Sequence, residues 1–237
     1  MTKAYNRILI KISGEQLAGQ YEFGVDPKIA SYLAQEIKKV VKRGVQVVVI
    51  VGGGNMVRGS EIAGNGIKRV TADQMGMLSG LINSMILTDI FENNNIQTRC
   101  LSNVFAEQVA ESYSYRRAYK HLDNGRVVII AGGIARPYFT HDTAAVSFAL
   151  ELETDIVLKA TKVDGVYDRD PNKYQDAVRL DKISFSDAVA NEEIKVMDKA
   201  ALGLAMDHNV PIVVFNPFKV DNILKVSLGE NIGTIIN

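Results

Sequence analysis

Residues suited to binding phosphate follow four apolar runs of the sequence, each at the point where the run ends. Lys11 and Gly14 follow the first run, glycines 52–54 follow the second, and mixed polar segments occupy 132–143 and 161–171. Glycine lets backbone N–H groups approach an anion, and lysine neutralises phosphate oxygens. Aspartate oxygens suit Mg²⁺. Together they predict phosphoryl transfer, in which positioning and charge stabilisation supply most of the catalysis.

Each of these motifs also has a purely structural interpretation. Glycines 52–54 could form only a tight turn, Asp164 followed by Gly165 is a strong hairpin signature, and Asp142 could simply cap a helix. Their recurrence at successive strand ends is what predicts a shared site. The three histidines lack metal-ligand spacing, and the single cysteine, Cys100, ends a buried-looking strand. No metal site built from protein side chains alone is therefore expected.

The elements that must position these residues alternate along the chain. Short apolar runs predict strands over 8–10, 45–51, 96–101, 127–131, 156–158 and 212–215. Several are apolar almost without a break, which is typical of a parallel sheet covered by helices on both faces. In such sheets ligands bind beyond the carboxyl ends of the strands. We therefore expect one α/β domain over 1–237, a mainly parallel sheet between two helix layers.

Helices are expected between the strands. The clearest begins after Asp26, an N-cap followed by Pro27, and ends at Gly44. Further helices are expected over 70–91, 104–122, 142–152 and 196–206.

Composition excludes several classes of protein. The 237 residues carry 27 Lys and Arg against 27 Asp and Glu, so no basic surface for nucleic acid is expected. No apolar run approaches the ~18 residues of a membrane helix, and the start of the chain lacks the apolar core of a signal peptide. A lone cysteine excludes an internal disulfide. These features fit a cytoplasmic protein with neither a nucleic-acid nor a membrane partner.

Common nucleotide-binding and hydrolase motifs are missing. The sequence contains no G-x-x-x-x-G-K-[ST] and no G-x-S-x-G, and no G-x-G-x-x-G opens a helix after the first strand. A P-loop kinase is excluded, and dinucleotide binding is only a weak alternative.

The segments taken together resemble the amino-acid-kinase superfamily. Residues 8–15 resemble its opening, and 52–59 with 73–78 resemble its bacterial UMP kinase branch. Further similar segments are 159–167, 195–198 and 213–216, and the collinear resemblance covers essentially the whole chain. It implies a three-layer αβα fold and transfer of the ATP γ-phosphoryl group to UMP with Mg²⁺, a step of pyrimidine biosynthesis. It also implies a homohexamer and GTP or UTP as effectors.

The resemblance assigns roles to individual residues. Lys11 and Asp142 are implied to be catalytic, Asp142 by orienting lysines, and Lys162 is a second candidate lysine. The implied ATP-binding residues are Lys11, Ile12, Ser13, Gly14, Gly54, Arg58, Thr161, Tyr167 and Asp170. The implied UMP-binding residues are Gly53, Asp73, Ile134, Ala135, Arg136, Pro137, Tyr138, Phe139, Thr140 and His141. The implied allosteric segment is Gly19, Gln20, Tyr21, Glu22, Phe23 and Gly24.

One stretch departs from the family pattern. Where relatives read Gly-Thr-Gly-Asn-Pro-Phe-Phe-Thr-Thr-Asp, this chain has Ile134, Ala135 and Arg136 after Gly133, and His141 before the aspartate. These changes lie on the acceptor side. Because a neutral imidazole can donate from one nitrogen and accept at the other, we expect His141 to read uracil. In the alternative interpretation, His141 points away and backbone groups read the base.

Two other functions stay open at this point. The first is a kinase of the same superfamily that acts on a carboxylate or carbamate. Arg58 and Asp73 argue against it, because they belong to the UMP kinase pattern. The second is a catalytically silent nucleotide-binding regulator. The intact set of Lys11, Asp142 and Asp170 argues against it, because a sensor needs no phosphoryl clamp.

Overall fold

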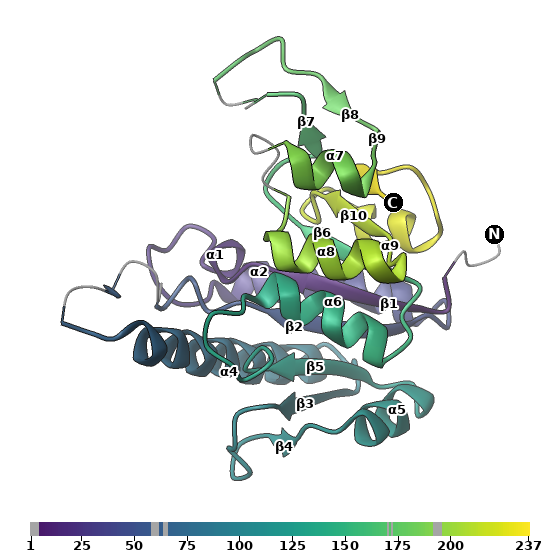
Figure 1. The fold of residues 1–237 in the computed structure, drawn as a ribbon. Coiled ribbons are helices and arrows are strands. Elements are labelled where there is room, and N and C mark those ends of the chain that lie inside the picture. The colour runs from purple at the N-terminus through teal and green to yellow at the C-terminus, as the bar shows by residue number, and fades with distance from the viewer. Residues whose placement is uncertain (1–4, 58–61, 64–65, 170, 172, 192–195) are drawn as a thin grey trace.

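A computed structural model describes residues 5–57, 62–63, 66–169, 171, 173–191 and 196–237. In this part of the chain one sheet contains the strands β1 (Arg7–Ile12), β2 (Gln46–Val51), β3 (Thr98–Ser102), β4 (Glu111–Ser112), β5 (Val127–Ala131), β6 (Ile156–Ala160), β9 (Lys182–Ile183), β10 (Ile212–Phe215) and β11 (Thr234–Ile236). Their order is β4-β3-β5-β2-β1-β6-β10-β11-β9 (Figure 1). Among the neighbours only β10 and β11 are antiparallel, which confirms the mainly parallel sheet.

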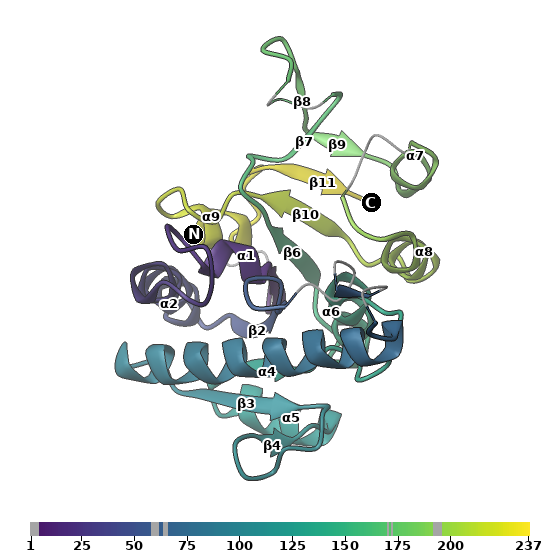
Figure 2. The same cartoon turned by 90° about the vertical axis from the view of Figure 1, so that its left-hand side faces the viewer.

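Helices cover both faces of this sheet. They are α1 (Gly14–Leu17), α2 (Pro27–Val41), α4 (Arg69–Asn93), α5 (Tyr115–Asp123), α6 (His141–Glu151), α7 (Phe185–Ala190), α8 (Lys199–His208) and α9 (Asn222–Ser227). Side chains of α1, α2, α4 and α9 share one apolar core, and those of α5 to α8 share the other (Figures 1 and 2). The predicted three-layer αβα sandwich is therefore confirmed. Outside it, β7 (Val166–Tyr167) pairs antiparallel with β8 (Arg179–Leu180) in a projecting arm.

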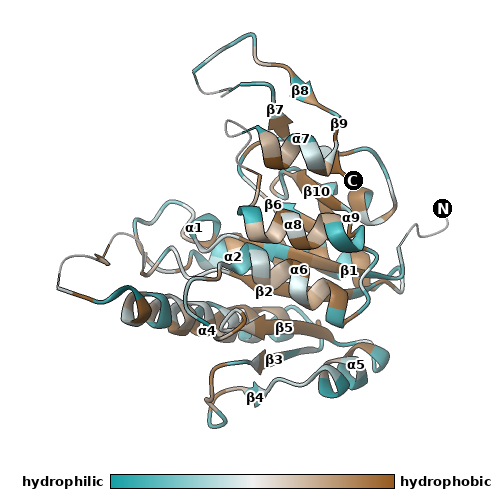
Figure 3. Cartoon of the chain, in the orientation of Figure 1, coloured by the Kyte–Doolittle hydropathy of each residue, from teal (hydrophilic) through white to brown (hydrophobic). Residues whose placement is uncertain are grey.

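Side chains along β1 alternate between the two faces of the sheet, and this alternation determines on which face Lys11 lies. Ile8, Ile10 and Ile12 are fully buried in the core that contains α2 and α4, whereas Leu9 belongs to the core that contains α6 and α8. Because strand residues two apart share a face, Lys11 lies on the α6 side with Leu9. The central strands are strongly apolar (Figure 3), so a lysine at this position is unusual.

The predicted strands agree with the structure, and α2, α4 and α6 begin or end within a few residues of their predicted bounds. As predicted, Asp26 caps α2, accepting a hydrogen bond from the Lys28 N–H at 2.9 Å. The helix predicted over 196–206 begins only at Lys199, because Asp198 is its N-cap. The cap of α6 is Thr140, so the alternative reading of Asp142 as the cap is wrong. No helix in the described ranges is long and apolar enough to cross a bilayer.

The single helix predicted over 104–122 is wrong. The Ser102 hydroxyl donates to the Val104 carbonyl at 2.7 Å, and the Tyr113 N–H donates to the Ser102 carbonyl at 2.9 Å. These bonds hold the chain in a loop that returns as β4 beside β3. The helix α5 begins only after Ser114, whose hydroxyl accepts from the Arg117 N–H. Long-range pairing thus overrides the helical pattern of this segment.

The hairpin predicted at Asp164 and Gly165 is also wrong. β6 pairs with β1 and β10, and β7 pairs with β8, so no hairpin joins β6 to β7. A Cβ at Gly165 would lie 2.6 Å from Oγ1 of Thr234, so the glycine lets this segment pass close to β11.

Candidate active site

Two lysines and one aspartate form an ion-pair cluster on the α6 face of the sheet. Lys11 on β1 and Lys159 on β6 are paired in the parallel ladder, so their side chains leave the same face. Asp142, in the first turn of α6, lies above them. Its Oδ1 is 2.8 Å from Nζ of Lys11, and its Oδ2 is 2.8 Å from Nζ of Lys159. The three side chains are only 12–14% exposed, so the charges interact in a poorly screened environment.

This burial perturbs the titration of the cluster. Burial alone would raise the pKa of Asp142, but the ammonium groups of Lys11 and Lys159 outweigh it and lower the pKa to about 2. Burial, and secondarily Lys11, lowers the pKa of Lys159 despite the opposing effect of Asp142. The carboxylate is thus ionised at neutral pH, and it holds two cations close together where an anion with several charges could approach.

Asp198 anchors the start of α6, which carries Asp142. Its carboxylate caps α8 by accepting from the Ala201 N–H at 2.8 Å. The same carboxylate accepts hydrogen bonds from the hydroxyls of Thr140 and Thr143, the latter at 2.9 Å. Since Thr140 is the N-cap of α6, this contact ties the first turn of α6 to that of α8.

Glycine is required where the two loops predicted to bind phosphate meet. A Cβ at Gly14 would lie 2.5 Å from the Gly52 carbonyl oxygen, and a Cβ at Gly53 would lie 2.8 Å from the Gly80 nitrogen of α4. Buried Asn83 of α4 donates to the same Gly52 carbonyl at 2.7 Å. The loop after β2 is therefore held tightly between β1 and α4, which argues against a turn of purely local importance.

A cavity of about 260 Å³, here called cavity A, opens between α4, the loop after β2 and the loop after β5. Of the predicted UMP-binding residues, it is lined by Gly53, Asp73, Ile134, Arg136, Phe139, Thr140 and His141. Ala135, Pro137 and Tyr138 do not line it. Ala135 and Tyr138 have φ values of +54° and +70°, in the left-handed region that favours glycine. The loop is therefore strained at both residues, and Ala135 stands where the family pattern has glycine.

Asp73 connects this loop to α4. Nε of Arg69 donates to both Asp73 oxygens, at 2.8 and 2.9 Å, and the Tyr138 N–H donates to Oδ2 at 2.8 Å. The Arg69 guanidinium also lies 5.2 Å from the centre of the Tyr138 ring. Arg69 lines cavity A and was missed in the sequence, although its spacing of four residues from Asp73 on a helix is a detectable ion-pair signal.

His141 lines cavity A, and its ring packs against Gly80 of α4. Its Nε2 has no hydrogen-bond partner among the described residues, so uracil reading by His141 stays a prediction. Burial, and secondarily the Lys11 charge, lowers the pKa of His141 to about 4 against the opposing effect of Asp142. The imidazole is therefore neutral at pH 7 and lies beside the lysine cluster.

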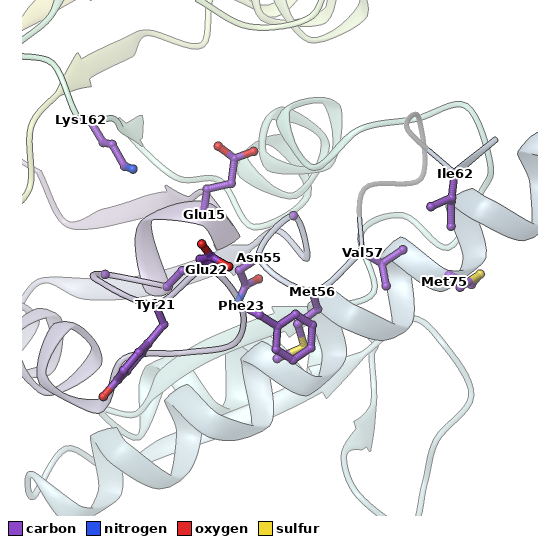
Figure 4. A pocket seen from close by; sticks show the side chains of 13 residues that line it. Glu15, Tyr21, Glu22, Phe23, Asn55, Met56, Val57, Ile62, Met75 and Lys162 are labelled. Atoms are coloured by element: carbon purple, nitrogen blue, oxygen red, sulfur yellow. The ribbon is translucent and has the colours of Figure 1, made fainter. Parts of the chain in front are cut away.

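A second cavity of about 530 Å³, cavity B, borders cavity A, and most of the residues that line cavity B are labelled in Figure 4. Gly54 and Val57 line both cavities. Glu15 and Lys162 point into cavity B, as Figure 4 shows. Four residues of the predicted allosteric segment, Gly19, Tyr21, Glu22 and Phe23, also line it, whereas Gln20 and Gly24 do not. This segment thus borders the glycine loop.

The other residues predicted to bind ATP lie along the carboxyl ends of β1 and β6. Ile12 ends β1, and Ser13 precedes α1, where its N–H donates to Oε1 of Gln16 at 3.1 Å. Thr161 follows β6, and its hydroxyl donates to the Val163 carbonyl at 2.8 Å. Tyr167 lies on β7, at the base of the arm. Arg58 and Asp170 lie outside the described residues.

The structure brings Lys159, rather than the predicted Lys162, to Asp142. Lys162 is exposed and lies three residues further along, beside cavity B. The ladder pairing of Lys159 with Lys11 was the missing information, because it depends on the neighbouring strand. Within the described ranges, no group of three or more His, Cys, Asp or Glu side chains could hold a metal ion.

Lys159→Met and Lys162→Met are expected to differ in which kinetic constant changes. Removing the Lys159 ammonium deletes a charged hydrogen-bond donor, worth about 1.5–3 kcal/mol, so kcat should fall about 10- to 100-fold. Lys162→Met should instead raise KM for the phosphoryl donor and change kcat less. Steady-state kinetics of both variants measure this, and a larger loss of kcat in Lys162→Met would contradict the assignment of Lys159.

Comparison with known proteins agrees with this geometry. Residues 6–216 match the amino acid kinase family. The chain is 46% identical to the uridylate kinase of Wolinella succinogenes, over 98% of this chain and 96% of that one. It is also similar to the crystal structure of UMP kinase from Bacillus anthracis, with a TM-score of 0.94, 40% identity and coverage of 98% and 96%. For UMP kinase from Ureaplasma parvum the TM-score is 0.91, the identity 34% and the coverage 100% of both chains.

Proposed function

The chain belongs to the amino acid kinase family, and we propose that it transfers the γ-phosphoryl group of ATP to UMP, giving ADP and UDP. The observation that carries this proposal is the cluster of Lys11, Lys159 and Asp142 beside the glycine loop between cavities A and B. The relatives named uridylate kinase and UMP kinase support UMP as the acceptor.

The reaction needs charge stabilisation more than proton transfer. The UMP phosphate is already an anionic nucleophile, so an oxygen of it attacks the γ-phosphorus while the bond to the β–γ bridging oxygen breaks. The main obstacle is repulsion between two polyanions. Lys11 and Lys159 offset it, and Asp142 holds both ammonium groups in place before substrate arrives, so little reorganisation is needed.

We propose that Mg²⁺ enters with ATP, held mainly by its phosphate oxygens. The described side chains fit this role better than that of a closed metal cage, because they form no cluster of three acidic ligands. The carboxylate of Glu15 lies against Gly54, with Oε1 3.4 Å from the position of an added Cβ there, and it would face the ion. Bound Mg²⁺ would supply further neutralisation of phosphate charge.

The two substrates would use different parts of the single domain. The N-terminal part supplies most of cavity A for UMP, and the residues after β6 lie on the ATP side. We propose GTP and UTP as effectors, and we place the GTP response at 19–24. This assignment is supported by the contact of that segment with the glycine loop, where the Gly24 N–H donates to the Asn55 carbonyl at 3.2 Å.

We also propose that the protein self-associates, as a homohexamer. The support is an apolar stripe on the solvent side of α4, where Leu78, Ile82 and Met85 are exposed at helical spacing. A second copy of the same stripe would bury it. Light scattering of the purified protein gives the molar mass that tests this.

The proposed activity is tested by offering Mg-ATP with a panel of acceptors. UMP, CMP, AMP, acetate and carbamate are supplied separately, and formation of ADP and of the phosphorylated acceptor is measured. UMP should be the best acceptor and UDP the product. Preference for a carboxylate or carbamate would favour another activity of the family. If none of the acceptors in the panel is phosphorylated, UMP phosphorylation is overturned.

Asp73→Ala should raise KM for UMP about 10- to 100-fold and leave KM for ATP nearly unchanged. The carboxylate would accept hydrogen bonds from the ribose hydroxyls, and it also fixes the acceptor loop through the Tyr138 N–H. Loss of charged hydrogen bonds costs about 1.5–3 kcal/mol. Initial rates with each substrate varied in turn measure the effect, and equal damage to both KM values would place Asp73 outside the acceptor site.

A further inference from the structure

The side chain of His141 occupies a notch whose walls are glycines. A Cβ at Gly80 would lie 3.0 Å from Nε2 of His141 and 3.3 Å from the Val51 carbonyl oxygen. A Cβ at Gly133 would lie 3.8 Å from the same nitrogen, and one at Gly52 would lie 3.9 Å from Nδ1. The contact at Gly80 would be tighter than most Cβ contacts in proteins, so a side chain at residue 80 would require the imidazole to shift by a few tenths of an ångström.

These glycines belong to the three segments that border cavity A, and Gly133 itself lines the cavity. Gly52 follows β2, Gly80 lies in α4, and Gly133 follows β5. His141 is the first residue of α6 and directly precedes Asp142. One ring therefore packs against the segments that surround the acceptor and is covalently next to the residue that orients the lysines.

The notch suits an uncharged ring. The charged groups that act on His141 are Lys11 from β1 and Asp142 from α6, whereas the three glycines present only backbone. Burial and Lys11 together lower its pKa to about 4. A protonated ring would add a buried positive charge beside Lys11, which is unfavourable.

We propose that His141 is a positioning residue whose imidazole, wedged against Gly80, sets the spacing between the start of α6 and α4, and thereby the fit of the acceptor nucleotide. This inference rests on the proposed function and extends it to a pair of residues, 80 and 141. A threonine at position 141 would leave part of the notch empty. A methyl group at position 80 would push the ring, and with it the first turn of α6, out of place.

The test is a double-mutant cycle with Gly80→Ala and His141→Thr. Gly80→Ala alone should raise KM for UMP about tenfold, with a smaller change in KM for ATP. In the His141→Thr background the same substitution should change KM for UMP less than threefold, because the ring is gone. A change in helix propensity cannot explain a higher KM for UMP in Gly80→Ala, since alanine is favoured over glycine inside a helix. Gly203→Ala in α8, where an added Cβ meets nothing within 4 Å, is the matched control.

A pH profile gives a second readout. The wild-type kcat/KM for UMP should fall more steeply between pH 5 and 3.5 than that of His141→Thr, because only the wild type gains a positive charge in the notch as the pH falls through the pKa of about 4. The inference would be overturned if the two substitutions changed KM for UMP additively. It would also be overturned if kcat/KM fell equally with decreasing pH in wild type and His141→Thr. If wild type forms UDP from UMP while the effects are additive, only the inference fails. If wild type forms no UDP, the proposed function itself fails.

Discussion

Replacing Lys11 with Met should lower kcat about 10²- to 10³-fold while the protein stays folded. Methionine keeps most of the volume of the stem and removes the charge that, in the proposed reaction, faces the transferring phosphoryl group. Loss of one preorganised electrostatic contact typically costs ~3–4 kcal/mol of transition-state stabilisation. Asp142 keeps its ion pair with Lys159 at 2.8 Å, so no buried carboxylate is left unpaired in this variant.

Rapid-quench or steady-state assays measure the loss, and thermal unfolding provides the control for folding. A Lys11→Met variant with a wild-type unfolding temperature and a kcat within threefold of wild type would remove Lys11 from the catalytic machinery.

Asp142→Asn should damage both activity and stability. Asparagine keeps the shape of the side chain but leaves the ammonium groups of Lys11 and Lys159 close together with no countercharge. Removing one partner of a buried ion pair costs about 3–5 kcal/mol. We expect that loss in the free energy of unfolding at pH 7, together with a fall in kcat of at least about 10²-fold, because neither lysine keeps its orientation.

The stability difference between wild type and Asp142→Asn should depend on pH in a defined window. The pKa of Asp142 in the folded protein is about 2, below its ordinary value of 3.8. Its ion pairs therefore stabilise the fold fully above about pH 4, and this contribution is lost as the pH falls toward 2. Urea unfolding at pH 7, 4 and 3 measures the difference, and equal urea midpoints at pH 7 would contradict the role of this carboxylate.

The local sequence was sufficient for most of the sheet and for one of the three residues of the ion-pair cluster. Apolar runs predicted the central strands, and Asp26 with Pro27 predicted the start of α2, because strand alternation and helix capping depend on neighbours within a few residues. Lys11 could be identified in the same way, since it lies one residue before the end of β1 and three residues before Gly14. Family resemblance added Asp142.

Only the tertiary structure decided which residues complete the site. Lys159, and not Lys162, pairs with Asp142 because the parallel register places Lys159 opposite Lys11. Asp73 accepts hydrogen bonds from both Arg69 and the Tyr138 N–H. Strand register and loop contacts depend on residues far apart in the chain, so the local periodicity of the sequence cannot predict them. The same reason applies to His141: its residue type suggested a base reader, and only the tertiary structure shows that its neutral ring packs against three glycines from separate segments.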